Sequence, residues 1–227
     1  MVKPAPILCF LKLYVMHRLL LFSLVFFGLL GCSEKRYHHE KVQVDLDTVP
    51  KVLHEVYEWQ NEKNESFRDG SLSPLRPKER KVFETLSFFA PDSTFMVIAA
   101  FEEVLGAEPF EMPTTANTST KEVLYGRLHF EMKGQSFSLE VYRAYEPEDD
   151  YVFLPFRDDT NGVSTYGGGR YLDLRYPLGD SVFVDFNKAY NPYCAYNPKY
   201  ACAIVPAVNT LSVEVTAGEK KFPLKLK

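Results

Sequence analysis

The chain has 227 residues, with 26 basic and 30 acidic side chains and a formal net charge of −4. This length suits one domain or at most two small ones, and a content of 46% hydrophobic and 25% charged residues excludes general disorder. The mild acidity gives no reason to expect a nucleic-acid partner. Aromatic residues make up 15% of the chain, most of them among its 14 Tyr and 18 Phe.

The first 31 residues are predicted to be a secretory signal peptide. They contain Lys3, Lys12 and Arg18 but no acidic residue, and they end in the apolar run LLLFSLVFFGLL at 19–30. The run is shorter than the roughly 20 apolar residues that a membrane-spanning helix needs. A cleaved signal is therefore the better interpretation.

The end of this run resembles the processing site of bacterial lipoproteins. Leu29-Leu30-Gly31-Cys32 has the form of a lipobox, in which a peptidase cuts before the cysteine and the thiol receives a diacylglycerol. The resemblance implies that Cys32 carries a lipid and that the membrane is a partner through it. It also implies a lipoprotein of the bacterial cell envelope, on the periplasmic or the surface face. Two or more acyl chains would anchor it stably, since each buried CH₂ contributes about 0.8 kcal/mol.

The predicted signal peptide sets the boundaries of the other parts of the chain. Because Met16 could begin a complete signal by itself, residues 1–15 are expected to be an over-extended gene start or a dispensable leader. Removal of residues 1–31 would change the net charge from −4 to −7. Residues 32–45 are polar and aperiodic and are predicted to tether the lipid to a single β-rich domain over 46–227.

One amphipathic helix is expected at the start of this domain. Thr48 is placed to cap it, and Val52, Val56 and Trp59 recur at the spacing that puts them on one face. We expect the helix to end near residue 66. One further helical turn is expected at 78–83.

Beyond residue 90 the hydrophobic period changes to two, which is typical of strands. The clearest pattern is a hairpin around Lys133-Gly134-Gln135. The expected strands are 94–101, 124–132, 137–142, 151–156, 170–174, 181–186, 211–215 and 222–226, with a loop at 106–120. Many short strands without βαβ alternation predict a mainly β fold, an antiparallel β-sandwich or partly closed barrel with an N-terminal helix.

The last third of the chain carries distinctive motifs. The sequence reads TYGGGRYLDL at 165–174, DFNKAYNP at 185–192 and AGEK at 217–220. These motifs resemble the DUF1684 family of bacterial and archaeal proteins of unknown function. The resemblance implies a shared fold, and it implies no activity, because the family has no established reaction.

A polar, aromatic pocket or partner-binding surface is expected in this region. Asn-Pro at 191–192 and again at 197–198 favours two turns close together, and the tyrosines around them can form aromatic walls. The same residues can equally satisfy the backbone of a long loop. The residues predicted to line the pocket are Arg170, Tyr171, Asp185, Asn187, Tyr190, Asn191 and Tyr196.

Arg170 has two interpretations. If it faces inward beside strand-like apolar residues, it needs a partner, so an ion pair with an aspartate such as Asp173 or Asp185 is one option. A bound carboxylate or phosphate is the other. The run Gly167–Gly169 likewise predicts either an anion-cradling loop or a tight turn into a strand.

Cys194 and Cys202 are predicted to form a disulfide, because the chain is expected in an oxidising compartment; inert thiols are the alternative. No metal site is expected, since neither a nearby His nor C-x-x-C spacing adds the ligands that zinc needs. No cofactor is expected either.

The sequence therefore predicts a lipid-anchored envelope protein whose β domain binds a small molecule or an envelope protein. G-x-S-x-G, H-E-x-x-H and P-loop patterns are missing from the sequence. A hydrolase-like enzyme that uses the Asp and Arg groups and a purely structural lipoprotein are the alternatives.

Overall fold

The computed structural model describes residues 44–223 of the chain. The predicted signal peptide, the lipidation site at Cys32 and most of the predicted tether lie outside the described residues. In the described range, no helix has the length and apolarity of a membrane span.

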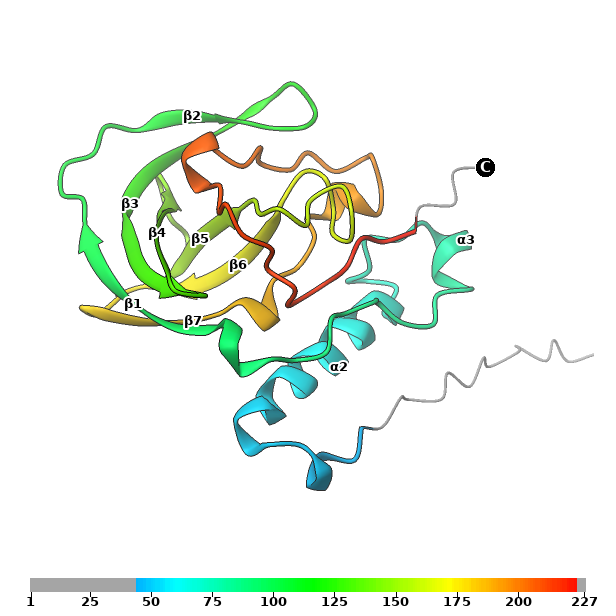
Figure 1. The fold of residues 1–227 in the computed structure, drawn as a ribbon. Coiled ribbons are helices and arrows are strands. Elements are labelled where there is room, and N and C mark those ends of the chain that lie inside the picture. The colour runs from blue at the N-terminus through cyan, green and yellow to red at the C-terminus, as the bar shows by residue number, and fades with distance from the viewer. Residues whose placement is uncertain (1–43, 224–227) are drawn as a thin grey trace, which may run out of the picture. The chain divides into compact units, whose positions relative to one another are not determined.

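Seven antiparallel strands form one curled sheet that is open along one side, like half of a barrel (Figure 1). The strand order is β6-β5-β4-β3-β1-β7, and β2 pairs with the first residues of β3. The strands are β1 (Met96–Glu103), β2 (Phe110–Pro113), β3 (Ser119–Met132), β4 (Gln135–Ala144), β5 (Tyr151–Phe156), β6 (Arg170–Arg175) and β7 (Ser181–Asp185). The predicted mainly β fold is confirmed.

The period-two pattern of the hairpin builds the main core inside the curl. Leu128 pairs with Leu139 across β3 and β4, and both side chains are fully buried. The C-terminal segment (orange to red in Figure 1) runs through the opening of the curled sheet and adds Leu211 and Val215 to the same core. The sheet alone therefore does not close this core.

β5 is buried on both faces, which shows that a second layer covers the sheet. Val152 and Leu154 point into the main core. Phe153 points the other way, into a separate cluster with Tyr142 of β4 and Tyr171 of β6. This second cluster lies on the outer face of the sheet, where the candidate site is found.

The N-terminal helix begins later than predicted. Turns of 3₁₀ helix at Leu46–Thr48 and Lys51–Leu53 precede α2, which spans His54–Arg68. Val56 is fully buried on its inner face, whereas Val52 lies before the helix and is exposed. The predicted helix is therefore correct in kind but starts about one turn late.

Two short elements follow. The expected helical turn is α3, at Pro77–Arg80. The predicted loop at 106–120 was wrong in part, because it contains β2. At four residues, including Pro113, this strand is too short to show a period-two pattern.

The strand predicted at 211–215 is absent. These residues form no ladder with the sheet, although Leu211 and Val215 point into the core as a strand residue would. Residues 222–223 are also outside any strand, and the remainder of the segment predicted at 222–226 lies beyond the described range. Hydrogen bonds from the side chain of Arg170 to the carbonyls of Val215 and Ala217 replace part of the missing ladder.

Candidate functional site

A cleft of about 480 Å³ lies between the outer face of the sheet, the loop at 190–203 and α2. Its walls carry the aromatic rings of Tyr151, Phe153, Tyr171, Tyr190, Tyr193 and Tyr200. We call it the tyrosine cleft. Side chains of β3, β4, β5 and β6 all line it.

Asp173 of β6 organises the aromatic wall. Its Oδ1 accepts hydrogen bonds from the hydroxyl of Tyr151 at 3.0 Å and from the hydroxyl of Tyr190 at 2.5 Å. Burial raises the pKa of both phenols, and the negative charge of Asp173 raises it further. Both tyrosines therefore remain neutral donors that hold their rings in place.

Lys63 of α2 approaches the cleft from the side opposite the sheet. Its Nζ lies 4.0 Å from the centre of the Tyr190 ring and 5.5 Å from the centre of the Trp59 ring. Burial lowers the pKa of Lys63, and the charges of Asp173 and Glu219 oppose that shift. The ammonium group forms no ion pair with any of the described residues.

Tyr171 and Tyr190, both named as candidate pocket residues, lie on the wall of the cleft. Their backbones pair through two hydrogen bonds of 2.9 and 3.0 Å, and the Tyr171 hydroxyl donates to the carbonyl of Ala203. These contacts fasten both ends of the loop at 190–203 to β6. These bonds fix the position of the cleft wall.

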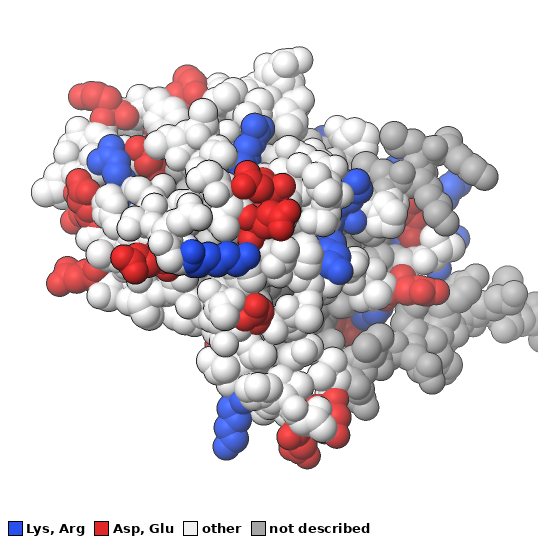
Figure 2. Space-filling view, in the orientation of Figure 1, with Lys and Arg blue, Asp and Glu red and all other residues white. Residues whose placement is uncertain are grey.

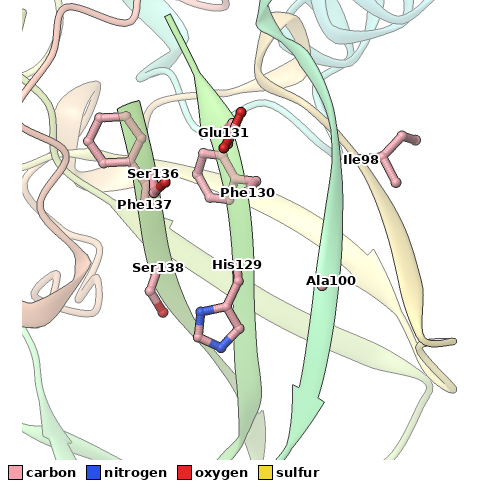
Figure 3. A pocket seen from close by; sticks show the side chains of 8 residues that line it. All are labelled: Ile98, Ala100, His129, Phe130, Glu131, Ser136, Phe137 and Ser138. Atoms are coloured by element: carbon pink, nitrogen blue, oxygen red, sulfur yellow. The ribbon is translucent and has the colours of Figure 1, made fainter. Parts of the chain in front are cut away.

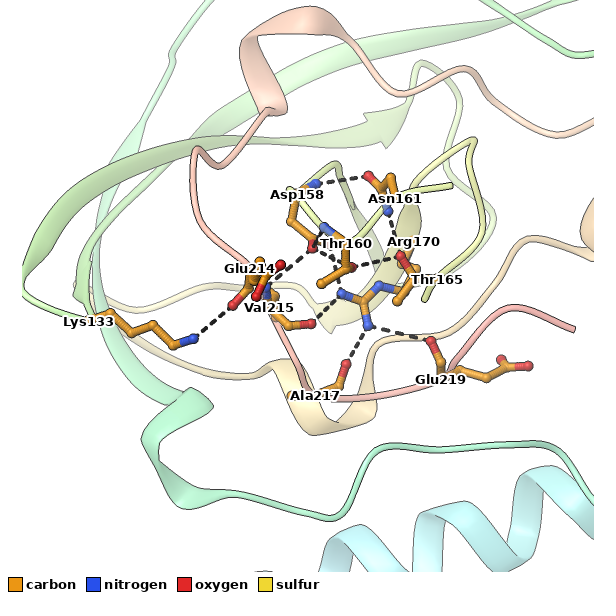
Figure 4. A network of polar contacts seen from close by, with 10 residues as sticks. All are labelled: Lys133, Asp158, Thr160, Asn161, Thr165, Arg170, Glu214, Val215, Ala217 and Glu219. Carbon is orange, nitrogen blue, oxygen red and sulfur yellow. Dashed lines mark hydrogen bonds and ion pairs between the residues drawn. The ribbon is translucent and has the colours of Figure 1, made fainter. Parts of the chain in front are cut away.

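Arg170 lies on the opposite face of β6 from Tyr171, inside the core (Figure 4). Its Nη2 lies 2.8 Å from Oδ2 of Asp158, and neither side chain has exposed surface. The same nitrogen donates to the carbonyl of Val215 at 2.9 Å, and Nη1 donates to that of Ala217. The guanidinium therefore binds the C-terminal segment and does not face the cleft.

Of the two interpretations of Arg170, the structure shows the ion pair, with a partner that the sequence did not indicate. Asp158, and not Asp173 or Asp185, takes that place. The glycine run before Arg170 is a turn into β6. Gly169 has φ +94, and a Cβ there would lie 2.6 Å from the carbonyl oxygen of Phe156.

Asp185 and Asn187 form a buried hydrogen-bonded turn that does not line the cleft. Oδ1 of Asp185 accepts from the backbone N–H of Asn187 at 2.9 Å and from its side-chain amide at 2.8 Å. Asn187 in turn bonds the backbone N–H and carbonyl of Asp92 at 2.8 and 2.9 Å. Their polar atoms join the end of β7 to the segment before β1.

Asn191 and Tyr196 surround a buried acid, Glu219, and also do not line the cleft. The Tyr196 hydroxyl donates to Oε1 of Glu219, and the backbone N–H of Asn191 donates to Oε2 at 3.1 Å. Burial raises the pKa of Glu219 to about 7, and these two donors oppose the shift. Asn191 also donates from its amide to the carbonyl of Lys220 at 2.9 Å.

Cys194 and Cys202 are neighbouring free thiols, and Cys202 lines the cleft. The backbone N–H of Cys194 donates to Sγ of Cys202 at 3.0 Å. Contact with the second thiol lowers the pKa of Cys194 to about 6. A disulfide between them stays a prediction.

A second, more open hollow of about 660 Å³ lies over β1, β3 and β4 (Figure 3). His129 lines it, with Nε2 2.9 Å from Oε2 of Glu102, and Ile98 at its rim is 65% exposed. The nearby Ser136 and Ser138 donate no hydrogen bond to His129. The hollow therefore lacks the nucleophile–base contact of a hydrolase.

On the face in Figure 2, basic side chains are scattered singly among acidic ones. Between residues 44 and 223, no three His, Cys, Asp or Glu side chains come together as metal ligands.

Sequence reasoning missed Lys63, Glu122, Tyr151 and Asp173 as cleft residues. Tyr151 and Asp173 could have been found from the strand alternation, because they share a face with Phe153 and Tyr171 once β5 and β6 are paired. Lys63 gave no signal, since it is one of several charged residues on the polar side of a helix.

The relatives found by comparison are of unknown function. The family model DUF1684, described as a protein of unknown function, matches residues 81–220. The chain is similar to the solution NMR structure of an uncharacterised protein from Haloarcula marismortui, with 34% identity over 75% of this chain and 94% of that one and a TM-score of 0.61. No curated protein matches. The family match includes all the strands, whereas Lys63 precedes it.

Proposed function

We propose that this chain, which belongs to the DUF1684 family of proteins of unknown function, binds a small molecule in the tyrosine cleft. The observation that carries the proposal is the cleft itself, whose volume of about 480 Å³ is that of a ligand pocket. Its walls are aromatic, and its few polar groups converge from different elements. Such walls with a small number of placed polar groups are typical of ligand sites.

The fixed position of the wall supports binding. The phenols of Tyr151 and Tyr190 are held by Asp173, and the Tyr171 hydroxyl is held by a backbone carbonyl. Rings that are already ordered lose little conformational freedom when a ligand arrives. The hydrolase alternative relied on Asp and Arg side chains that a substrate can reach. Arg170 and Asp158 are instead fully buried and paired with each other. The geometry therefore favours binding over hydrolysis.

Filling the cleft is expected to remove a bound ligand. Ala201 is exposed at the cleft, so Ala201→Trp adds an indole there without deleting a core contact. Ala100→Trp is the matched control, because Ala100 is exposed in the hollow of Figure 3. Native mass spectrometry of full-length protein from its own cells should show a ligand on the unaltered chain and the control, and none on Ala201→Trp. A ligand retained by Ala201→Trp, or none on the unaltered chain, contradicts the proposal.

We also propose that a lipid on Cys32 tethers this domain to the bacterial cell envelope. The support is the lipobox sequence at 29–32 behind a basic and apolar leader. The tether would present the cleft to ligands in the periplasm or at the cell surface.

Cys32→Ser is expected to release the protein from the membrane, because serine cannot carry the thioether-linked lipid. Partitioning between a non-ionic detergent phase and water should move the chain from the detergent to the aqueous phase. Cys9→Ser, which changes a cysteine of the predicted leader, should leave partitioning unchanged. A Cys32→Ser chain that stays in the detergent phase would show that the anchor lies elsewhere.

A further inference from the structure

The lining of the tyrosine cleft holds two carboxyl groups and one ammonium group. Neither Asp173 of β6 nor Glu122 of β3 forms an ion pair with a residue in the described range. Both phenols that bond Asp173 do so at Oδ1, which leaves Oδ2 without a hydrogen-bond donor from that range. Burial raises the pKa of Glu122, and a hydrogen bond from Thr120 opposes that shift. A cationic ligand would supply both groups with a partner.

The aromatic walls favour the same charge. The face of an aromatic ring is electronegative and attracts a cation within about 6 Å of its centre. The chain already uses two of these rings in this way, since Lys63 Nζ lies 4.0 Å from the centre of Tyr190 and Lys199 Nζ lies 4.7 Å from that of Tyr200. Tyr171 stands edge-on to Phe153, with ring centres 4.7 Å apart.

We infer that the tyrosine cleft selects ligands that carry a positively charged nitrogen on an apolar body, such as protonated or quaternary ammonium compounds. The inference rests on the proposed binding function and narrows the class of ligand. Lys63 then acts as an internal cation on the face of Tyr190, and its charge opposes a second cation. An anionic ligand paired with Lys63 is the opposite outcome, which the experiment must distinguish.

Three probes that share one ring and differ in charge test the inference: benzyltrimethylammonium, benzyl alcohol and benzoate. Their affinities for the full-length chain in a non-ionic detergent can be measured by ligand-observed NMR. We expect the cation to bind about tenfold more tightly than the alcohol, which lies between the values for an exposed and a desolvated cation–π contact. Benzoate should bind most weakly, and Ala201→Trp should abolish binding of all three.

Two variants assign the selectivity to named charges. Asp173→Asn keeps an oxygen that accepts from Tyr151 and Tyr190 but removes the charge, so it should bring the affinity of the cation close to that of the alcohol. Lys63→Gln should tighten the cation severalfold by removing the opposing charge. Glu102→Gln, which removes a 57% exposed carboxyl that does not line the cleft, should change none of the three affinities.

The outcomes distinguish a failure of the predicted charge selectivity from a failure of the proposed binding function. Equal affinity for the three probes, or tightest binding of benzoate with loss in Lys63→Gln, overturns the charge selection and leaves the cleft as a binding site. If no probe shows binding that Ala201→Trp abolishes, the inference also fails. The native mass spectrum then decides the binding function separately.

Discussion

Replacing Arg170 with methionine is expected to lower the free energy of unfolding by about 3–5 kcal/mol, because it leaves the carboxylate of Asp158 buried without its partner. Both side chains of this pair are fully buried, with Nη2 and Oδ2 2.8 Å apart. The substitution also removes the donors to the carbonyls of Val215 and Ala217. An unsatisfied buried carbonyl adds to the loss. Urea unfolding of the variant and the native chain measures the difference.

A second arginine on the same strand provides the control. Arg175 pairs with Asp150 at 2.9 Å, almost the same distance, but the two side chains are 63% and 56% exposed. Arg175→Met should therefore change the free energy of unfolding by no more than about 1 kcal/mol. Equal losses in the two variants would contradict the structural role assigned to Arg170.

The role of Arg170 explains how the fold closes its core without another strand. The C-terminal segment brings Leu211, Val215 and Ala217 into the opening of the curled sheet. Its carbonyls are satisfied partly by the guanidinium, which reaches them from β6 (Figure 4). One buried arginine thus replaces ladder bonds at the position where the half-barrel stays open.

Local patterns predicted the strands well and the C-terminal segment poorly, and the reason is physical. β5 was predicted at its observed bounds, Tyr151–Phe156, because apolar residues between turn signals suffice to define it. Leu211, Val213 and Val215 show the same alternation without forming a strand. The backbones of Leu211 and Val213 bond those of Arg157 and Asp159, and the carbonyl of Val215 accepts from Arg170. Alternation reports which side chains are buried and does not report what satisfies the backbone.

The candidate site was predictable only in part for a related reason. The density of tyrosines at 190–200 indicated an aromatic wall, and Tyr171 and Tyr190 lie on it. The charged members come from elements that are distant in the sequence. Asp173 and Glu122 share the cleft because β6, β5, β4 and β3 lie side by side in that order in the sheet. Lys63 joins them only through the packing of α2. Strand order and helix packing are long-range properties that local periodicity does not contain.

The stability of this domain is expected to fall as the pH rises from about 4.5 to 7, and Glu219 is the main source that the structure identifies. Burial raises its pKa from 4.5 to about 7, so the folded state holds a proton that the unfolded state has released. The contribution of this group is complete below pH 4.5 and lost above pH 7. The difference in pKa corresponds to about 3 kcal/mol. Hydrogen bonds from Tyr196 and Asn191 oppose this shift, so burial is its cause.

Glu219→Gln isolates this contribution, because glutamine keeps an oxygen for the Tyr196 hydroxyl and has no titrating group. Urea unfolding at intervals from pH 5 to 8 should show the native chain losing about 2.5 kcal/mol relative to the variant across this range. Asp185 and Glu122, whose pKa values are also raised by burial, are present in both chains and cancel in the difference. Glu214→Gln, an exposed change on the same segment, should give a curve parallel to that of the native chain. Parallel curves for Glu219→Gln as well would mean that Glu219 is ionised in the folded state throughout, and that Tyr196 and Asn191 stabilise its charge more than burial opposes it.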